Sequence, residues 1–514
     1  MALRGADVVA RALARAGTRY VFALSGNHVM PIFDAALNAK LRLLHVRHEA
    51  AAVHMADAWA RLTGEAGVAL VTGGPGHANA VSALYTALAA ESAVVLLSGH
   101  APLNELGKGA FQEMAQAEMA APACKASWTV RSAATLGEDL ARAIRMAKAG
   151  RPGPVHLSLP SDVLEAEVDV ELPAKEAFLP APFLAQAGVN EEILAALQKA
   201  KKPLVIAGPA SGNARGRALL RQFEEITRVP AIMMESPRGV NDPSLGLLAD
   251  VLGAADLVVL AGKRRDFTLR FGAAFAADCR VIDIEAGVAQ WLAPAARITW
   301  AKSGWLDEVH AAIAFRPAPW KNLASKPGGP LHPVEVGRAV QKLLDAPEAV
   351  LVADGGEFGQ WAQATLSAPH RVINGPAGSI GAALPFAAAA KLALPGSNVV
   401  AMLGDGTFGF HASELDTAVR CGLAFVAVVG NDACWNAEYQ IQLRSYGAAR
   451  AHGLDLLATR YDRVAEGFGA HGEYVARPAE LAPALERAAG AGRAACVNVM
   501  IERLPAPVFR RQDA

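Results

Sequence analysis

Short apolar runs alternate with longer amphipathic stretches along the whole chain. The runs at residues 67–71, 92–98 and 398–403 are mainly aliphatic and are bounded by glycine or polar residues, which is typical of buried strands. Between such runs, apolar side chains recur at helical spacing, for example in residues 5–16. Strands that alternate with helices predict parallel sheets, because each crossover helix returns the chain to the same edge of the sheet.

The alternation appears three times and predicts an α/β fold of three doubly wound open-sheet domains, at residues 1–168, 190–316 and 334–514. Two stretches rich in Pro, Ala and Lys, residues 170–189 and 317–333, are interpreted as linkers. The first and third domains are expected to be variants of one architecture. The other predicted strands are residues 20–24, 41–46, 154–159, 203–206, 229–233, 257–260, 281–284 and 424–429.

The composition argues against several classes of partner. The 49 Lys and Arg residues balance 49 Asp and Glu residues and form no obvious basic face, so nucleic acid is not an expected partner. No apolar run approaches the roughly 18 residues that a membrane span needs, and the N-terminus is interpreted as a helix and not as a signal peptide. The five cysteines are scattered without metal-site spacing, which favours reduced thiols and a cytoplasmic location.

The stretch at residues 404–435 carries the clearest chemical pattern. It begins with Gly-Asp-Gly at the end of a predicted strand, and the next predicted strand brings Asp432 to the same sheet edge, 27 positions after Asp405. Two carboxylates beside a glycine turn and a helix start suit a divalent cation that holds a diphosphate. A backbone carbonyl near Cys434 completes the predicted Mg²⁺ site. A helix cap and a turn are the structural alternatives for the two aspartates.

A helix is predicted at residues 411–420, with Glu414 and Asp416 on its polar face. The tail after Met500 is short, so a lid over the active site is expected to be missing.

Gly-Asp-Gly followed by some 25 residues and Asn-Asp resembles the signature of thiamine-diphosphate enzymes. RHEAAAVHMADAWARLTGEAGVALVTGGPGHANAV, residues 47–81, is similar to the pyrimidine-binding domain of the acetolactate synthase group. GAFQEMAQAEMAAPACKASW, residues 109–128, is similar to the next block of that group, and residues 375–389 to the loop that receives the aminopyrimidine. The resemblance covers the whole chain and implies pyrimidine-binding, central and diphosphate-binding domains.

Within that group, His28, Gln112 and the GDG-to-GND region resemble benzaldehyde lyase most. GKRRDFTLRFG, residues 262–272, is similar instead to the 2-hydroxyacyl-CoA lyases. The chain departs from many relatives in carrying Asp432 where they have asparagine, which exchanges one oxygen ligand for another.

The resemblance implies catalytic roles for four residues. Glu49 would hydrogen-bond a ring nitrogen of the aminopyrimidine and promote its imino tautomer. His28 would shuttle the hydroxyl proton of a 2-hydroxy ketone, and Gln112 would hydrogen-bond the same oxygen. His77 lies in the glycine-rich loop and is expected to face the cofactor. The structural alternatives are a helix-terminal charge for Glu49 and a histidine that closes a strand end for His28.

Thirteen residues are assigned to cofactor binding by the same resemblance. Ile380 would hold the cofactor in a bent shape, Gly378 would accept a hydrogen bond from its amine, and Phe358, Trp361 and Trp435 would wall the pocket. The full set is Glu49, Pro75, Asn79, Glu357, Phe358, Gly378, Ile380, Gly404, Gly406, Thr407, Asp432, Cys434 and Trp435, with Asp405, Asp432 and Cys434 at the metal.

Two further expectations concern the central domain and the assembly. GPASGNARG, residues 208–216, looks like a nucleotide loop, but such loops more often only connect a strand to a helix. A flavin signature is not found, so FAD or ADP in the central domain is not expected, although it is not excluded. The family places its active site between subunits, which implies a homodimer or a homotetramer.

These patterns lead to a thiamine-diphosphate and Mg²⁺ dependent carbon–carbon lyase or carboligase. It would act on 2-hydroxy ketones, aldehydes or 2-hydroxyacyl thioesters through an enamine intermediate. The alternative is an acetolactate-synthase-like or decarboxylating enzyme that uses a 2-oxo acid such as pyruvate. A non-catalytic cofactor-binding protein is disfavoured by Glu49. A nicotinamide dehydrogenase is disfavoured because no G-x-G-x-x-G follows the first predicted strand.

Overall fold

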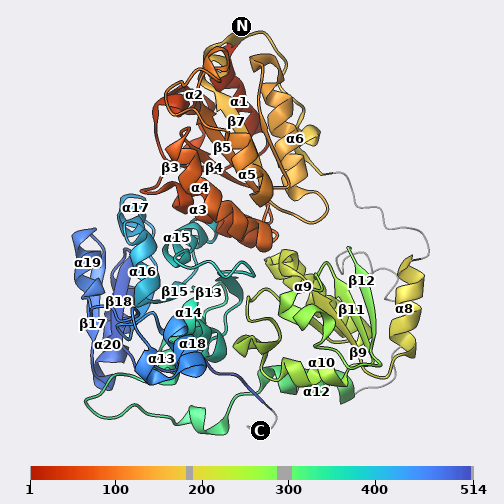
Figure 1. Ribbon diagram of the computed structural model, residues 1–514, viewed down its shortest axis with the longest axis vertical. Helices are drawn as coiled ribbons and strands as arrows, with labels where there is room; N and C mark the ends of the chain where they lie inside the picture. Colours follow the sequence, from red (N-terminus) through yellow and green to blue (C-terminus); the bar gives the residue numbers. More distant parts are fainter. Residues whose placement is uncertain (1, 181–188, 286–303, 511–514) are drawn as a thin grey trace. The chain divides into compact units, whose positions relative to one another are not determined.

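The computed structural model describes residues 2–180, 189–285 and 304–510 (Figure 1). By its internal packing the chain divides into two compact units, residues 1–182 and 183–514. Three parallel sheets form the framework, one in the first unit and two in the second, as expected for an α/β fold. The two sheets of the second unit belong to one compact body, and separate domain boundaries within it remain a prediction.

The first unit contains a six-stranded parallel sheet in the order β3-β2-β4-β5-β7-β6. Its strands are β2 Tyr20–Ala23, β3 Arg42–His45, β4 Gly67–Val71, β5 Val94–His100, β6 Ala126–Thr129 and β7 Val155–Pro160, and the short strands β1 Leu3–Arg4 and β8 Glu167–Val168 form an antiparallel pair. Its helices are α1 Gly5–Arg15, α2 Met30–Ala39, α3 Glu49–Thr63, α4 Pro75–Ala89, α5 Gln116–Ala120, α6 Leu136–Lys148 and α7 Ser161–Glu165.

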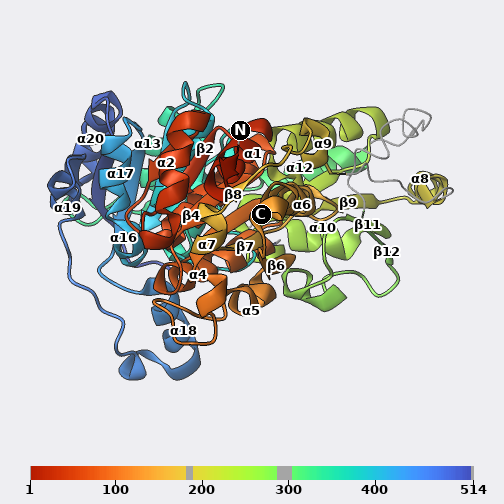
Figure 2. The ribbon, with the colours of Figure 1, turned by 90° about the horizontal axis from the view of Figure 1, so that it is seen from above.

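Helices cover both faces of this sheet (Figure 2). On one face, α1, α2 and α6 pack their apolar stripes against alternate residues of the strands, such as Val21 and Leu97. On the other face, Phe22 points the opposite way and meets Trp59 of α3, with ring centroids 6.5 Å apart. Double coverage explains why the strands read as unbroken apolar runs.

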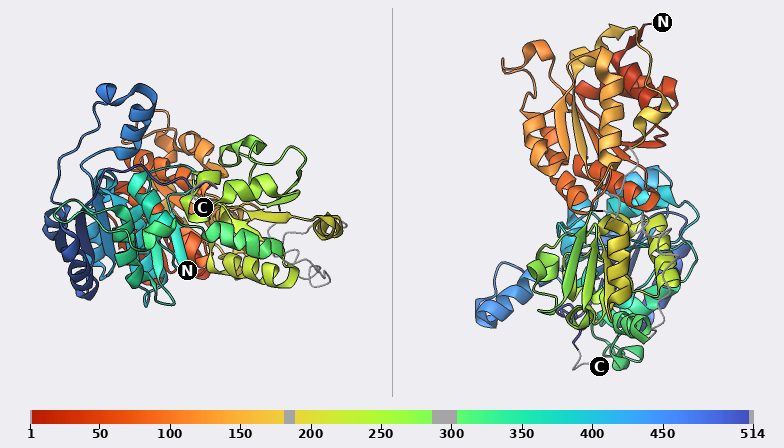
Figure 3. Two further views of the ribbon diagram at one scale, coloured as in Figure 1. Left: turned by 90° about the horizontal axis from the view of Figure 1, so that it is seen from below. Right: turned by 90° about the vertical axis from the view of Figure 1, so that its right-hand side faces the viewer.

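The second unit begins with a four-stranded parallel sheet in the order β10-β9-β11-β12 (Figure 3). Its strands are β9 Pro203–Ala207, β10 Ala231–Met233, β11 Leu257–Ala261 and β12 Arg280–Ile284, and its helices are α8 Val189–Lys199, α9 Ala214–Thr227, α10 Leu248–Ala254 and α12 Gly304–Ala314. The described residues of α8 and α9 pack on one face, and α10 and α12 pack on the other.

The last sheet has six parallel strands in the order β14-β13-β15-β16-β18-β17. Its strands are β13 Val350–Ala353, β14 His370–Ile373, β15 Val399–Gly404, β16 Val426–Asn431, β17 His471–Val475 and β18 Ala495–Met500. Its helices are α13 Pro333–Leu344, α14 Gly356–Thr365, α15 Ala383–Ala393, α16 Asp405–His411, α17 Glu414–Arg420, α18 Asn436–Tyr446, α19 Tyr461–Gly467 and α20 Pro478–Gly490.

The two six-stranded sheets have the same topology. In each, the second strand lies outside the first, the chain then reverses direction across the sheet, and the last two strands exchange places. The reversal falls between β2 and β4 in the first unit and between β13 and β15 in the second. Ligands of doubly wound sheets bind at the carboxyl ends of the strands beside such a reversal, so both sheets provide a natural site there.

Three local predictions were wrong. The helix expected at residues 411–420 begins six residues earlier, at Asp405, and a break separates α16 from α17. Glu414 is buried and accepts a hydrogen bond from Thr417 Oγ1, so it does not lie on a polar face. The first predicted linker is partly structured, since Phe178 packs into the core of the first unit. Residues 181–188 of that linker lie outside the described residues.

Within the described ranges, no helix is both long enough and apolar enough to cross a lipid bilayer.

Candidate active site

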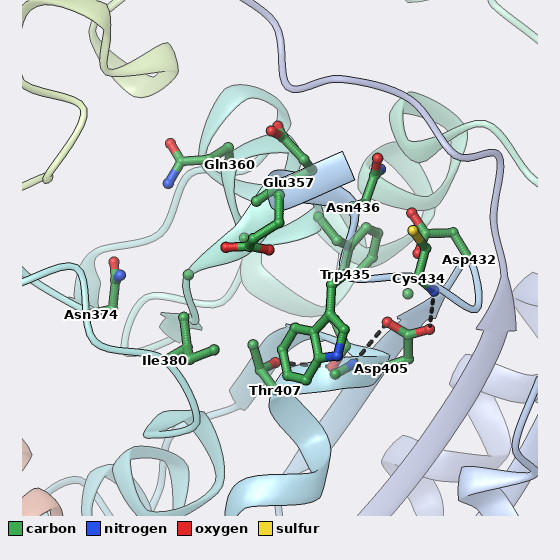
Figure 4. A pocket seen from close by; sticks show the side chains of 18 of the residues that line it. Glu357, Gln360, Asn374, Ile380, Asp405, Thr407, Asp432, Cys434, Trp435 and Asn436 are labelled. Carbon is green, nitrogen blue, oxygen red and sulfur yellow. Dashed lines mark hydrogen bonds between the residues drawn. The ribbon is translucent and has the colours of Figure 1, made fainter. Parts of the chain in front are cut away.

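Two carboxylates leave neighbouring strands of the last sheet and lie together at its carboxyl edge (Figure 4). Gly404, at the end of β15, pairs with Gly430 of β16, so Asp405 and Asp432 follow adjacent strand ends. Asp405 Oδ1 accepts a hydrogen bond from the Gly406 amide at 2.8 Å, and its Oδ2 accepts one from the Cys434 amide at 3.3 Å. These bonds fix the Asp405 carboxylate against the loop that carries Asp432.

The electrostatics of this pair favour a cation. Burial raises the pKa of Asp405. Burial and the neighbouring Asp405 carboxylate together raise the pKa of Asp432 to about 7. Burial also raises the pKa of the Cys434 thiol to about 11, so the sulfur stays protonated at neutral pH and is a poor metal ligand. The backbone carbonyl of Cys434 is the better ligand. Among the described residues, no three His, Cys, Asp or Glu side chains gather as a metal site, so the remaining ligands must come from the backbone and from a bound molecule.

A buried asparagine builds the turn after β16. Asn431 Oδ1 accepts a hydrogen bond from the Ala433 amide at 3.2 Å, while its Nδ2 donates to the Thr459 carbonyl at 3.0 Å. Ala433 adopts a left-handed conformation with φ of 53°, which L-residues disfavour. The hydrogen bonds of Asn431 therefore stabilise a backbone conformation that alanine disfavours.

A cavity of about 240 Å³ opens beside the two carboxylates. All ten cofactor-binding residues predicted in this part of the chain line it, together with Asp405. The sequence prediction missed several others. The lining residues comprise Pro237, Arg238, Gly355, Gly356, Glu357, Phe358, Gln360, Asn374, Gly378, Ile380, Gly404, Asp405, Gly406, Thr407, Gly430, Asp432, Cys434, Trp435, Asn436, Ala437 and Glu438.

Glycines at strand ends make room for the apolar walls of the cavity. A methyl group on Gly406 would lie 2.6 Å from the ring of Trp435, and one on Gly430 would lie 2.4 Å from the ring of Phe358. A methyl group on Gly355 would lie 2.6 Å from Ile380 Cγ2. Separations below 3 Å are not tolerated without a shift, so these glycines permit the three side chains to line the cavity.

Two amide side chains in the wall have polar atoms without a partner. In the described part of the chain, Gln360 Oε1 and Asn374 Oδ1 are buried and make no hydrogen bond. Orphaned buried polar atoms are costly, so these amides fit a bound molecule that carries hydrogen-bonding groups. Neither residue follows a recognisable motif, and only their location in the fold reveals them.

The predicted catalytic glutamate lies at the sheet edge of the first unit. Glu49 is the first residue of α3, and its Oε2 accepts a hydrogen bond from Asn79 Nδ2 of α4 at 3.0 Å. A methyl group on Gly76 would lie 3.3 Å from Glu49 Oε1, so the loop after β4 packs close to the carboxylate. Pro75 is exposed at the start of α4. The structure thus brings Glu49, Asn79 and Pro75 to one end of the sheet.

His28 lies at the reversal point of the same sheet. Its Nδ1 is 3.3 Å from Thr72 Oγ1, and its ring stacks on Phe111 with centroids 6.1 Å apart. Burial, and then the nearby His100, lower the pKa of His28 below its usual value. The imidazole is therefore neutral at neutral pH, as a proton shuttle requires.

Gln112 and Gln116 both contact Gly74, Gln112 through its backbone and Gln116 through its side chain. Gln112 has a left-handed backbone with φ of 58°, and its backbone packs on Gly74. Gln116 Oε1 accepts from the Gly74 amide at 2.8 Å, and its Nε2 donates to the Gly99 carbonyl at 3.1 Å and to Ser158 Oγ at 3.0 Å. Gln116, which the prediction missed, therefore ties the glycine-rich loop to the sheet.

His77 does not share the accessible edge with Glu49. Its side chain is fully buried, its Nδ1 lies 2.8 Å from Ser98 Oγ, and its ring lies 4.5 Å from that of His156. A helix position that faces the sheet turns the ring inward, so the expectation that it faces a cofactor is not supported. His77 is a core residue in this structure.

Acid should destabilise the first unit through His77. Burial lowers the pKa of His77 to about 4, so the free energy of unfolding includes about 3 kcal/mol above pH 6.5 that is lost as the pH falls towards 4. The unfolded chain binds the proton at the higher pH, which sets this sign. We expect urea unfolding between pH 7.5 and 4.5 to show the loss, and the variant His77→Gln to show a shallower slope. Equal slopes would assign the acid sensitivity to other groups.

Comparison with known proteins shows to which family the chain belongs. Residues 3–119 match the model of the N-terminal TPP binding domain of thiamine pyrophosphate enzymes, and residues 354–499 match the model of the C-terminal TPP binding domain. An acetolactate synthase large subunit of Mycobacterium tuberculosis is 32% identical over 98% of this chain and 97% of its own length. The chain belongs to the thiamine pyrophosphate enzymes. It is also similar to human 2-hydroxyacyl-CoA lyase 2, with 31% identity over 93% of this chain and 86% of that protein.

The residues of this thiamine pyrophosphate enzyme fit the cofactor that its family binds. The paired carboxylates suit a cation, and the N-terminus of α14, with Gly355 and Gly356 in the cavity wall, suits a diphosphate. The N-terminal TPP binding domain holds Glu49 and Asn79 at its sheet edge. The apolar walls and polar amides of the cavity in the second unit suit a ring system with hydrogen-bonding groups.

One expectation about the rim of the cavity was wrong. Trp361 does not line the cavity, because its ring packs between Trp320 and His332, each with centroids 5.4 Å away. The short C-terminal tail contacts residues of the cavity wall, and the expectation that a lid is missing stays a prediction. The Ala506 amide donates to Glu357 Oε2.

The glycine-rich loop of the central sheet is held by its own hydrogen bonds. Asn213 Oδ1 accepts from the Gly216 amide at 2.8 Å and caps α9, while Arg217 Nε donates to the Gly212 carbonyl at 2.8 Å. Arg217 also lies 3.5 Å from Glu235. These contacts describe a capped connection, and whether a nucleotide binds there stays an open prediction.

Proposed function

We propose that this thiamine pyrophosphate enzyme is a Mg²⁺-dependent carbon–carbon lyase and carboligase. Its substrates would be 2-hydroxy ketones, aldehydes or 2-hydroxyacyl thioesters. The alternative is an acetolactate-synthase-like or decarboxylating enzyme that acts on a 2-oxo acid such as pyruvate. Relatives named for each of these reactions match the chain, so the choice depends on the chemistry of the cavity.

The charge of the cavity lining favours an uncharged substrate. Among the described residues that line it, Arg238 is the sole cation, against the carboxylates of Glu357, Asp405, Asp432 and Glu438. Arg238 is already paired with Glu357 at 3.5 Å. A 2-oxo acid would bring a further carboxylate without a spare cation to meet it, whereas a 2-hydroxy ketone, an aldehyde or a thioester carries no charge at the reacting carbon.

The residues divide the work of such a site. Asp405, Asp432 and the Cys434 carbonyl would hold Mg²⁺, and Thr407 and the N-terminus of α14 would face the diphosphate. Thiamine diphosphate supplies the electron sink that stabilises a carbanion next to the reacting carbonyl. Ile380 would set its bend.

Proton transfer falls to the first unit. Glu49 would exchange a proton with a pyrimidine nitrogen, with Asn79 orienting the carboxylate through Oε2. His28 would take up and return the hydroxyl proton of the substrate as a neutral base. Thr72 orients His28 from the neighbouring strand end, and Gln112 would hydrogen-bond the substrate oxygen.

We also propose that the active enzyme is a homodimer or a homotetramer. The Glu49 edge and the cavity belong to different compact units, and each carries only part of the residues that the reaction requires. A second copy of the chain would complete each site. The five cysteines, all within the described residues, form no disulfide, which fits the proposed location in a reducing cytoplasm.

The test is a turnover assay with thiamine diphosphate and MgCl₂ on benzoin, acetoin, a 2-hydroxyacyl-CoA and pyruvate. We expect aldehyde release from at least one of the first three. Turnover of pyruvate alone would establish the alternative reaction, and turnover of none would contradict both.

A further inference from the structure

The segment that follows β18 contacts residues of the cavity wall. Residues 503–509, the C-terminal strap, follow β18 and reach three separate parts of the second unit. The first contact is at the metal-site turn. The Arg503 guanidinium donates to the carbonyl oxygens of Asp432 and Ala433, at 3.2 Å each, and pairs with Asp455 at 3.0 Å. It also lies over the ring of Tyr439, 5.2 Å from its centroid.

The second contact is with two side chains of the cavity wall. Asn436 Nδ2 donates to the Leu504 carbonyl at 3.0 Å, and Glu357 Oε2 accepts from the Ala506 amide. Asn436 and Glu357 come from α18 and α14, so the strap joins two elements that line the cavity.

The third contact anchors the far end of the strap. Phe509 is 9% exposed and packs against Phe315 and Trp320, with ring centroids 6.0 and 5.5 Å away. Arg316 lies over the Phe509 ring at 5.3 Å and holds the Phe315 and Ala364 carbonyls. The strap is therefore fixed at both ends, by the packing of Phe509 at one end and by the hydrogen bonds of the Arg503 guanidinium at the other.

We propose that the C-terminal strap is part of the cofactor site and that Arg503 is a positioning residue for the metal-site turn. The turn needs such support because Ala433 is left-handed. Nη2 of Arg503 donates to both carbonyls while Nη1 pairs with Asp455, so the planar guanidinium holds the turn against Asp455 and leaves the carbonyl of Cys434 for a cation. The inference rests on the proposed Mg²⁺ site.

Arg503→Gln tests the proposal through binding and not through turnover. Groups that orient metal ligands typically contribute 10- to 100-fold in metal affinity, so we expect Mg²⁺ to bind at least tenfold more weakly at saturating thiamine diphosphate. The readout is the change in tryptophan fluorescence during a MgCl₂ titration, and Trp435→Phe, which removes the tryptophan that lines the cavity, identifies its share of the signal. Arg503→Lys keeps the charge without the planar guanidinium and should fall between the parent and Arg503→Gln.

Arg493→Gln is the matched control, because Arg493 is an exposed arginine just before β18, at the opposite end of that strand. Its Mg²⁺ affinity should equal that of the parent. The melting temperature of each ligand-free variant identifies a variant that fails to fold, in which case Arg503→Lys carries the test.

The outcomes separate the two proposals. A parent protein that binds no Mg²⁺ would overturn the proposed metal site and the strap's role with it. A parent that binds Mg²⁺ while Arg503→Gln binds it equally well would overturn only the role of Arg503. An equal loss in Arg493→Gln would do the same, because the effect would then follow net charge.

Discussion

Glu49→Gln is expected to lower kcat by roughly 10²- to 10⁴-fold, the usual contribution of a positioned acid–base group. Glutamine has the same shape and can still accept the Asn79 hydrogen bond, so the sheet edge should keep its structure. It cannot exchange a proton with a pyrimidine nitrogen. Mg²⁺ affinity and melting temperature should therefore change little while turnover of the best substrate is lost. Steady-state kinetics with the substrate found in the turnover assay measure the effect.

Glu138→Gln is the control for Glu49→Gln. Glu138 is an exposed glutamate in the first turn of α6, as Glu49 is in α3, so both changes remove the same helix-terminal charge. Only the Glu49 change should affect kcat. Full activity of Glu49→Gln would mean that Glu49 only provides a favourable charge at the N-terminus of α3 and takes no part in the reaction.

Asp405→Asn is expected to weaken Mg²⁺-dependent binding of thiamine diphosphate by at least about 100-fold. Both oxygens of Asp405 accept backbone hydrogen bonds, so an amide would turn an NH₂ group towards one of those donors and disturb the turn as well as the metal. Asp432→Asn replaces one oxygen ligand by another and should lose less than tenfold. The change in tryptophan fluorescence during a MgCl₂ titration measures both constants.

The two variants also differ in their pH dependence. Burial and Asp405 raise the pKa of Asp432 to about 7, so protons should compete with Mg²⁺ as the pH falls below 7. The parent should therefore bind Mg²⁺ more weakly at pH 6 than at pH 8, and Asp432→Asn should lose much of this dependence. Equal pH dependence in both proteins would show that another group controls binding.

Part of this site could be predicted because its residues lie within short sequence motifs. Gly-Asp-Gly and Asn-Asp lie directly after buried strands, and parallel strands present their carboxyl ends at one edge. Asp405 and Asp432 therefore had to lie close together once the crossover was recognised. Ile380 and Trp435 were assigned through the family resemblance alone, and both line the cavity.

Other residues could not be predicted because their partners are far away in the sequence. Gln360 and Asn374 lie in the cavity wall without any motif. His77 directly follows the glycine-rich loop, yet the orientation of α4 buries its ring beside His156. Glu414 looked polar, but the packing of α17 buries its carboxylate against Thr417. Which side of a helix meets the core is a property of packing, and an alanine-rich pattern specifies it weakly.

The amino-acid order alone was sufficient for the α/β framework, the repeated topology and the paired aspartates, because strand runs, glycine turns and crossovers are short-range features. The tertiary structure decided what surrounds that pair. It showed that the cavity lining carries one cation against four carboxylates, and that Arg503 lies against the carbonyls of residues 432 and 433. Those contacts join residues some 70 to 200 positions apart, and chain packing alone brings them together.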